Sequence, residues 1–132
     1  MIFENNTEYL ILAIIYQTHR EISSTPYGIL ANVKGGGAFE AGGWNSQICD
    51  LMKPDEGEIV VKGKTGLCGF VSTNLDFILR QNRIHNIILG GFLTNCCVES
   101  TMRTAYENGY RVYTMKDCCA GKFFDISQPK IY

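Results

Sequence analysis

Cys97 stands at a point in this sequence where a buried strand gives way to a helix. The apolar residues 86–89 predict the strand, and residues 97–108, closed by Gly109, predict the helix. The first turn of a helix carries unpaired N–H groups and the positive end of the helix dipole, which favour a thiolate over a thiol. The same N–H groups can stabilise an oxyanion beside the sulfur. The pattern predicts a cysteine nucleophile, and a packed structural cysteine is the alternative.

A positive charge near that thiol would favour the thiolate further. Lys62 and Lys64 lie two residues apart at the end of an expected strand, residues 58–62, and either could supply the charge. The alternative is that both are solvated surface lysines. His19 follows another expected strand, and we assign it to substrate contact rather than to a base, because nothing in the sequence pairs with it. His85 precedes its strand and is expected at the surface, away from Cys97.

The elements that must position these residues alternate along the chain. Apolar or β-branched runs predict strands at residues 10–17, 58–62, 86–91 and 110–115, and helical patterns fall at residues 44–52, 73–82 and 97–108. Residues 23–43, rich in glycine and serine, are expected to form a long loop with room for a short helix. In the helix at 73–82, Asp76 and Arg80 have the spacing of an ion pair. Such alternation predicts an α/β fold with a parallel sheet, whose ligands bind at the carboxyl ends of the strands.

Composition narrows the class of protein further. The chain has 132 residues, 45% of them hydrophobic and 19% charged, as in a single globular domain. A net charge of −1 gives no reason to expect nucleic acid or an anionic membrane as a partner. The longest apolar run, residues 9–16, is too short to span a bilayer, so the expected location is the cytoplasm. The six cysteines lack the spacing of a zinc site, and we expect neither a metal nor a cofactor.

Residues 91–105 closely resemble the signature of the isochorismatase-like cysteine hydrolases. They read Gly-Phe-Leu-Thr-Asn-Cys-Cys-Val-Glu-Ser-Thr-Met-Arg-Thr-Ala. Upstream, residues 58–61, 64–70 and 73–76 resemble the lysine segment of that family, and downstream residues 108–112 and 117–120 also fit. The resemblance runs from about Trp44 to Ala120, more than half of the chain.

The resemblance implies a three-layer α/β/α sandwich with a six-stranded parallel sheet. It also implies hydrolysis of a small amide, carbamoyl or ureido compound, through a thioester and an Asp–Lys–Cys triad. Cys97 matches the nucleophile. Lys64 matches the lysine when counted back from residues 69–70, whereas counting forward from Glu58 favours Lys62, and we prefer Lys64 because its anchor is closer.

Further site features follow from the same resemblance. A cis peptide is expected between Phe92 and Leu93, with the N–H groups of Leu93 and Cys97 forming an oxyanion hole. From their places in the sequence, and not from the resemblance, His19, Trp44 and Phe70 are expected to shape the substrate pocket. Members of the family are often homo-oligomers, so a homo-oligomer is the expected assembly.

The sequence departs from the family pattern at both ends. The family aspartate follows a first apolar strand in an Asp-x-Gln segment that has no match here, and residues 121–132 do not resemble the closing elements. We therefore expect residues 1–132 to be a single domain truncated at both ends. Asp117 lies at the correct edge of the sheet but in another strand, so it is not expected to replace the missing aspartate.

Because the missing strand is central in the family, the strands at 10–17 and 86–91 are expected to pair directly or to leave exposed edges. Two hypotheses about function remain: an active cysteine hydrolase, and a catalytically inactive family fragment that serves as a binding or regulatory scaffold. Redox chemistry at Cys96-Cys97 or Cys118-Cys119 is a weaker third, since adjacent cysteines form a strained ring on oxidation.

Overall fold

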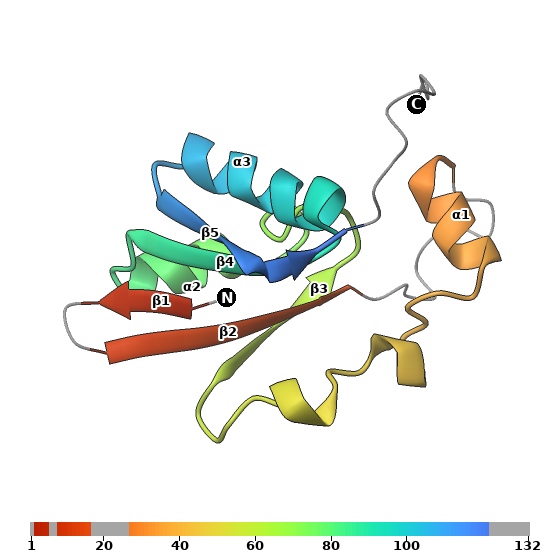
Figure 1. Cartoon of the computed structure of the whole chain (residues 1–132), viewed down its shortest axis with the longest axis horizontal. Coiled ribbons are helices and arrows are strands. Elements are labelled where there is room, and N and C mark those ends of the chain that lie inside the picture. The colour runs from red at the N-terminus through yellow and green to blue at the C-terminus, as the bar shows by residue number, and fades with distance from the viewer. Residues whose placement is uncertain (1, 6–7, 17–26, 122–132) are drawn as a thin grey trace.

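The computed structural model describes residues 2–5, 8–16 and 27–121 (Figure 1). The elements in chain order are β1 (Ile2–Asn5), β2 (Glu8–Tyr16), α1 (Ile29–Gly35), η1 (Trp44–Ser46), η2 (Asp50–Met52), β3 (Ile59–Lys64), α2 (Leu75–Gln81), β4 (Asn86–Phe92), η3 (Thr94–Val98), α3 (Glu99–Glu107) and β5 (Arg111–Ala120). Strands and helices alternate from β3 onward, which confirms the predicted α/β class.

The described strands form one sheet in the order β3-β2-β1-β4-β5. β2 pairs with β3 in parallel, and β4 pairs with β5 in parallel. β1 is antiparallel to both of its neighbours, β2 and β4. The four longer strands therefore run in one direction, and their carboxyl ends share one edge of the sheet. Ligands of α/β proteins bind at that edge.

β1 occupies the centre of the sheet, and we did not predict it. Its residues Ile2–Asn5 pair with β2, and Ile2 to Glu4 also pair with residues 86–88 of β4. The expectation that β2 and β4 would pair directly or leave exposed edges was therefore wrong. An antiparallel neighbour needs only a short connection, so the segment just before β2 can fold back and occupy the gap.

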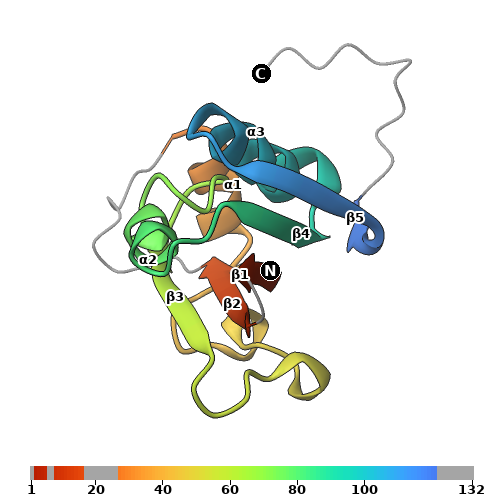
Figure 2. The ribbon, with the colours of Figure 1, turned by 90° about the vertical axis from the view of Figure 1, so that its left-hand side faces the viewer.

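α2 and α3 cover the same face of the sheet (Figure 2). The buried apolar side chains that join these helices to the strands are Val61, Leu75, Leu79, Ile87, Leu89, Val98 and Ala105. On β4 the residues Ile87 and Leu89 point toward the helices, as the two-residue period of a strand requires. The paired residues Ile88 and Tyr113 point to the other face, where Tyr113 is exposed. Burial of the first set holds the strands and helices in register.

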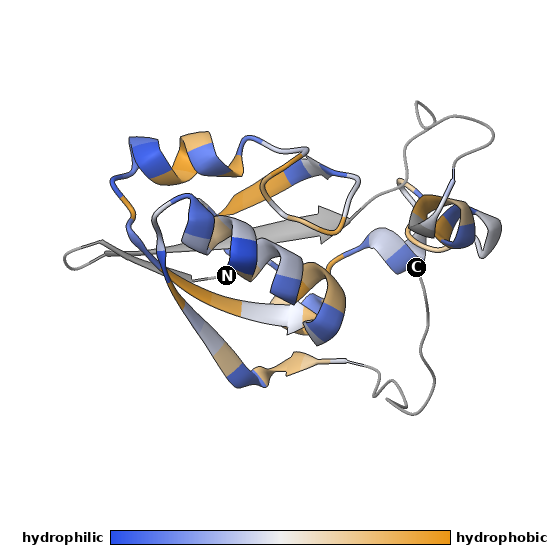
Figure 3. Ribbon diagram, turned by 90° about the horizontal axis from the view of Figure 1, so that it is seen from above, coloured by the Kyte–Doolittle hydropathy of each residue, from blue (hydrophilic) through white to orange (hydrophobic). Residues whose placement is uncertain are grey.

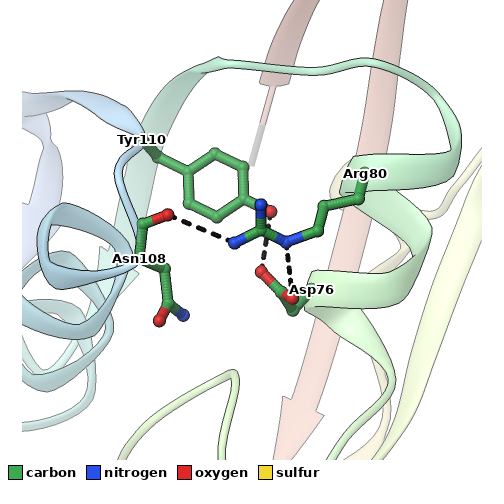
Figure 4. A network of polar contacts seen from close by, with 4 residues as sticks. All are labelled: Asp76, Arg80, Asn108 and Tyr110. Carbon is green, nitrogen blue, oxygen red and sulfur yellow. Dashed lines mark hydrogen bonds and ion pairs between the residues drawn. The ribbon is translucent and has the colours of Figure 1, made fainter.

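A polar network joins the two helices at the amino edge of the sheet (Figure 4). Arg80 Nε donates to Asp76 2.8 Å away, which confirms the ion pair predicted from the spacing. Arg80 also donates to the carbonyl oxygen of Asn108, at the end of α3. The hydroxyl of Tyr110 donates to the second oxygen of Asp76 at 2.8 Å. These contacts hold α2 against the end of α3 at the amino edge of the sheet. Ligands of α/β proteins bind at the opposite, carboxyl edge.

Residues 44–52 differ from the single short helix that we predicted. They form two separate 3₁₀ turns, Trp44–Ser46 and Asp50–Met52, because Gln47 and Cys49 between them have extended backbone angles. The loop at residues 23–43 contains the short helix α1, which lies beyond the carboxyl ends of the strands (Figures 1 and 3). No helix in the described ranges is both long and apolar enough to cross a membrane.

Candidate active site

Residues 93–98, called the nucleophile turn after the role predicted for Cys97, begin where β4 ends at Phe92. The peptide bond between Phe92 and Leu93 is cis, as expected. Thr94–Val98 then form a wide π-type turn, in which the N–H of Val98 donates to the carbonyl of Leu93 at 3.2 Å. Cys97 lies inside this turn rather than at the first residue of α3. Turns of this type are rare and frequently occur at functional sites.

Glycines let β5 approach β4 closely below this turn. A Cβ on Gly90 would lie 2.9 Å from the carbonyl oxygen of Cys118. β4 changes from apolar residues to glycines toward its carboxyl end, which Figure 3 shows as a change from orange to pale. Leu89 pairs with Thr114, but Gly91 pairs with Cys119, so β5 has extra residues that bulge at this edge. Bulges of this kind are over-represented beside active sites.

A second bulge, in β3, separates the two candidate lysines. Ile14 of β2 pairs with Val61 of β3, and Tyr16 pairs with Lys64. Between these two pairs β2 has one residue and β3 has two. The backbone of Gly63 has φ +87°, which a side chain would disfavour. An extra residue reverses the face to which the following side chains point. Lys62 is accordingly exposed, whereas Lys64 is only 5% exposed.

The ammonium group of Lys64 lies between the lysine loop, residues 65–72, and the nucleophile turn. Its Nζ donates to the carbonyl oxygen of Gly66 at 2.7 Å and to Sγ of Cys97 at 3.5 Å. Burial lowers the pKa of Lys64 from its ordinary value, and attraction to the sulfurs of Cys97 and Cys68 opposes that shift. A buried ammonium thus contacts a half-buried thiol at the carboxyl edge of the sheet.

Three other residues predicted for the site, Lys62, Trp44 and Phe70, do not join this pair. Lys62 lines a separate hollow with Ser72 and Thr73, which contains neither Cys97 nor Lys64. Trp44 is 88% exposed, whereas Lys64 is buried. Phe70 belongs to the core instead: it is 8% exposed and its ring lies 5.9 Å from that of Tyr110. His19 lies outside the described residues.

Threonines that we did not single out connect the lysine loop to α3. The N–H of Gly69 donates to Oγ1 of Thr101 at 2.9 Å, and the thiol of Cys68 donates to Oγ1 of Thr104 at 3.2 Å. Thr101 is 4% exposed and follows Cys97 by four residues, one helical turn. That spacing was the available signal, because it puts a hydroxyl on the side of the helix that carries the thiol.

Comparison with known proteins shows which fold and family this arrangement resembles. Residues 7–128 match the family model described as Isochorismatase domain. Ureidoacrylate amidohydrolase RutB of Pseudomonas savastanoi is 42% identical over 69 residues, which cover 52% of this chain and 28% of that protein. RutB of Variovorax paradoxus is 41% identical over 76 residues, 58% of this chain and 30% of that protein. The chain thus matches less than a third of the length of these curated relatives.

Solved structures extend the likeness to most of the chain. A cysteine hydrolase from Pseudomonas syringae superposes with a TM-score of 0.77 at 22% identity, over 88% of this chain and 54% of that one. N-carbamoylsarcosine amidase from Thermoplasma acidophilum gives a TM-score of 0.72 at 25% identity, over 86% and 61%. These superpositions confirm the predicted isochorismatase-like fold.

Proposed function

This chain belongs to the isochorismatase family, and on that premise we propose that it hydrolyses a C–N bond in a small amide, carbamoyl or ureido compound. The match of residues 7–128 supports the family, and two similar proteins are amidases by name, ureidoacrylate amidohydrolase and N-carbamoylsarcosine amidase. We further propose that Cys97 is the nucleophile and that Lys64 is its cationic partner.

The observation that carries the proposal is the 3.5 Å contact between Lys64 Nζ and Cys97 Sγ. A buried lysine is expensive unless its charge is compensated. A thiolate at Cys97 compensates it, and in turn the ammonium stabilises the thiolate, which is the reactive form of cysteine. The two side chains therefore favour each other's charged states, in a place where neither has the full stabilisation of bulk water.

The reaction would proceed through a thioester. The thiolate of Cys97 attacks the carbonyl carbon, and the N–H groups of Leu93 and Cys97 stabilise the resulting oxyanion. The C–N bond then breaks, and the leaving nitrogen takes a proton from the ammonium of Lys64, whose lowered pKa makes it a stronger acid than an ordinary lysine. Water next attacks the thioester and gives up a proton to Lys64, which releases the acid and restores the thiolate and ammonium.

Release of ammonia or amine from a panel of substrates tests this proposal. The panel should contain simple amides, N-carbamoyl amino acids and ureido acids, each incubated with the wild-type chain, C97S and C49S. Cys49 is an exposed cysteine in the segment between the two 3₁₀ turns, so C49S is the matched control. We expect release by the wild type and C49S, and none by C97S.

The same preparations should be alkylated with iodoacetamide at mildly acidic pH, with Cys97 followed by peptide mass spectrometry. A wild-type Cys97 that reacts no faster than a model thiol, together with no product from any substrate, contradicts the proposal. That result would favour the alternative of an inactive binding or regulatory scaffold.

A further inference from the structure

The lysine loop is tied to α3 through the buried backbone of Gly69. Its N–H donates to Oγ1 of Thr101 at 2.9 Å, and its carbonyl oxygen accepts from Oγ1 of Thr73 at 2.6 Å. Gly69 and Thr101 are both buried, so the N–H of Gly69 has little water with which to replace its bond to Thr101. A buried donor that loses its acceptor bears the full cost of desolvation.

Thr101 lies one helical turn beyond Cys97. Thr101 belongs to the first turn of α3, and Cys97 lies in the π-type turn directly before that helix, so the backbone couples the position of the hydroxyl to that of the sulfur. Figure 1 shows this region beside the connection between β3 and α2. Any displacement of the lysine loop relative to α3 must stretch the bond between Gly69 and Thr101. The bond acts as a fixed link between the loop and the nucleophile.

The same loop holds the ammonium of Lys64. Nζ donates to the carbonyl of Gly66, three residues before Gly69. Because Nζ reaches Sγ of Cys97 at 3.5 Å while it is bound to this loop, a shift of the loop relative to α3 would lengthen the contact. The long lysine side chain alone cannot fix this distance, since its many rotamers are costly to order.

We propose that Thr101 is a positioning residue, whose hydroxyl sets the distance between the Lys64 ammonium and the Cys97 sulfur through its bond to the N–H of Gly69. Thr101 touches neither the substrate nor the reacting atoms. This inference rests on the proposed function, because it assigns Thr101 a role only if Lys64 activates Cys97. Removing the hydroxyl loosens the loop, and the thiolate loses its partner while the fold persists.

The test compares T101V with T101S, and with T114V as a control that removes an exposed threonine hydroxyl from β5. Valine keeps the shape of threonine, and serine keeps the hydroxyl. The rate of Cys97 alkylation by iodoacetamide is measured from pH 5 to pH 10, beside the midpoint of thermal unfolding. We expect T101V to react about tenfold more slowly than the wild type near pH 6.5. Near pH 10, where thiols ionise without help, the two rates should converge.

T101S should restore the wild-type pH profile, and T114V should leave it unchanged. An unaltered profile in T101V, even with a lower unfolding temperature, overturns the inference, since a purely structural role predicts that result. If T101V does not fold, T101A is measured against T101S by the same criterion. A wild-type Cys97 that is no more reactive than a model thiol, together with no product from any substrate, refutes the proposed function itself, which distinguishes the two failures.

Discussion

The ammonium nitrogen of Lys64 lies 3.5 Å from the sulfur of Cys97, although their strands are not neighbours. β3 and β4 have two strands between them in the sheet, which puts their axes about 14 Å apart at ordinary strand spacing. The contact therefore depends on the lysine loop and the nucleophile turn, which reach toward each other at the edge of the sheet where β2, β3 and β4 end. Changes in either connection should act on the pair.

Replacing Lys64 with alanine should slow the alkylation of Cys97 and reduce hydrolysis. Without the ammonium, the thiolate loses its attraction and the leaving nitrogen loses its proton donor, a loss that commonly costs about 10²–10⁴ in rate. K62A is the matched control, because Lys62 is exposed two residues away and lines another hollow. Steady-state rates and iodoacetamide kinetics measure both effects. Equal losses in K62A and K64A would contradict the assignment of Lys64.

Replacing Gly63 with alanine should disturb the site through the bulge in β3. At φ +87° an added side chain is strained, and its Cβ would lie 3.1 Å from the carbonyl oxygen of Ser72. We expect a loss of about 1–3 kcal/mol in the free energy of unfolding, and slower alkylation of Cys97. The control is G35A, where no atom lies within 4 Å of the new Cβ. Urea titration and iodoacetamide kinetics provide the measurements, and unchanged values in G63A would show that the bulge tolerates a side chain.

Sequence patterns were sufficient for the parts of the fold that depend on local periodicity. Three features were predictable because each depends only on a few neighbouring residues. They are the strand before Cys97, the helix after it and the ion pair of Asp76 with Arg80. β1 was not, since its short segment becomes a strand only through pairing with β2 and β4. Spacing alone left Lys62 and Lys64 open, because the bulge at Gly63 decides which of them faces the helices. Phe70 resembles a pocket residue in its motif, but packing against Tyr110 puts it in the core.

The pH dependence of hydrolysis should show an alkaline limb set by Lys64. Burial lowers the pKa of this lysine below its ordinary value of 10.5, so the ammonium is lost at a lower pH than for an exposed lysine. Once Lys64 is neutral it neither attracts the thiolate nor donates a proton. We expect kcat/KM to fall as pH rises, with a midpoint below 10.5. Circular dichroism over the same range checks that the chain is folded, and a midpoint above 10.5 in a folded chain would refute the link.

Replacing Lys64 with arginine should separate its two proposed roles. The guanidinium keeps the positive charge beside Cys97 but does not give up a proton in this pH range. We expect K64R to be alkylated faster than K64A, yet to hydrolyse substrate about 10²–10⁴ times more slowly than the wild type. Wild-type turnover in K64R would show that the leaving nitrogen takes its proton from another group.

Tyr110, at the edge of the sheet opposite the candidate site, should make the free energy of unfolding depend on pH. Burial, together with its hydrogen bond to Asp76, raises the pKa of Tyr110 to about 12 from an ordinary value of 10.0. Between these values the unfolded chain loses the phenol proton and the folded chain keeps it, so the free energy of unfolding falls as pH rises. We expect a fall of about 1–2 kcal/mol from this residue across that window.

In Y110F the fall between pH 10 and pH 12 should be smaller, because phenylalanine has no proton to lose. The variant should also be less stable at pH 7, by about 1–3 kcal/mol, since Asp76 loses the donor at 2.8 Å. The lowered pKa of Lys64 acts in the opposite direction, because the unfolded chain then binds more protons, but its contribution is common to both chains and cancels in their difference. Y113F, which removes a hydroxyl from an exposed ring, is the control. Urea titrations at several pH values measure these differences, and parallel slopes for Y110F and the wild type would show that Tyr110 titrates alike in the folded and unfolded chains.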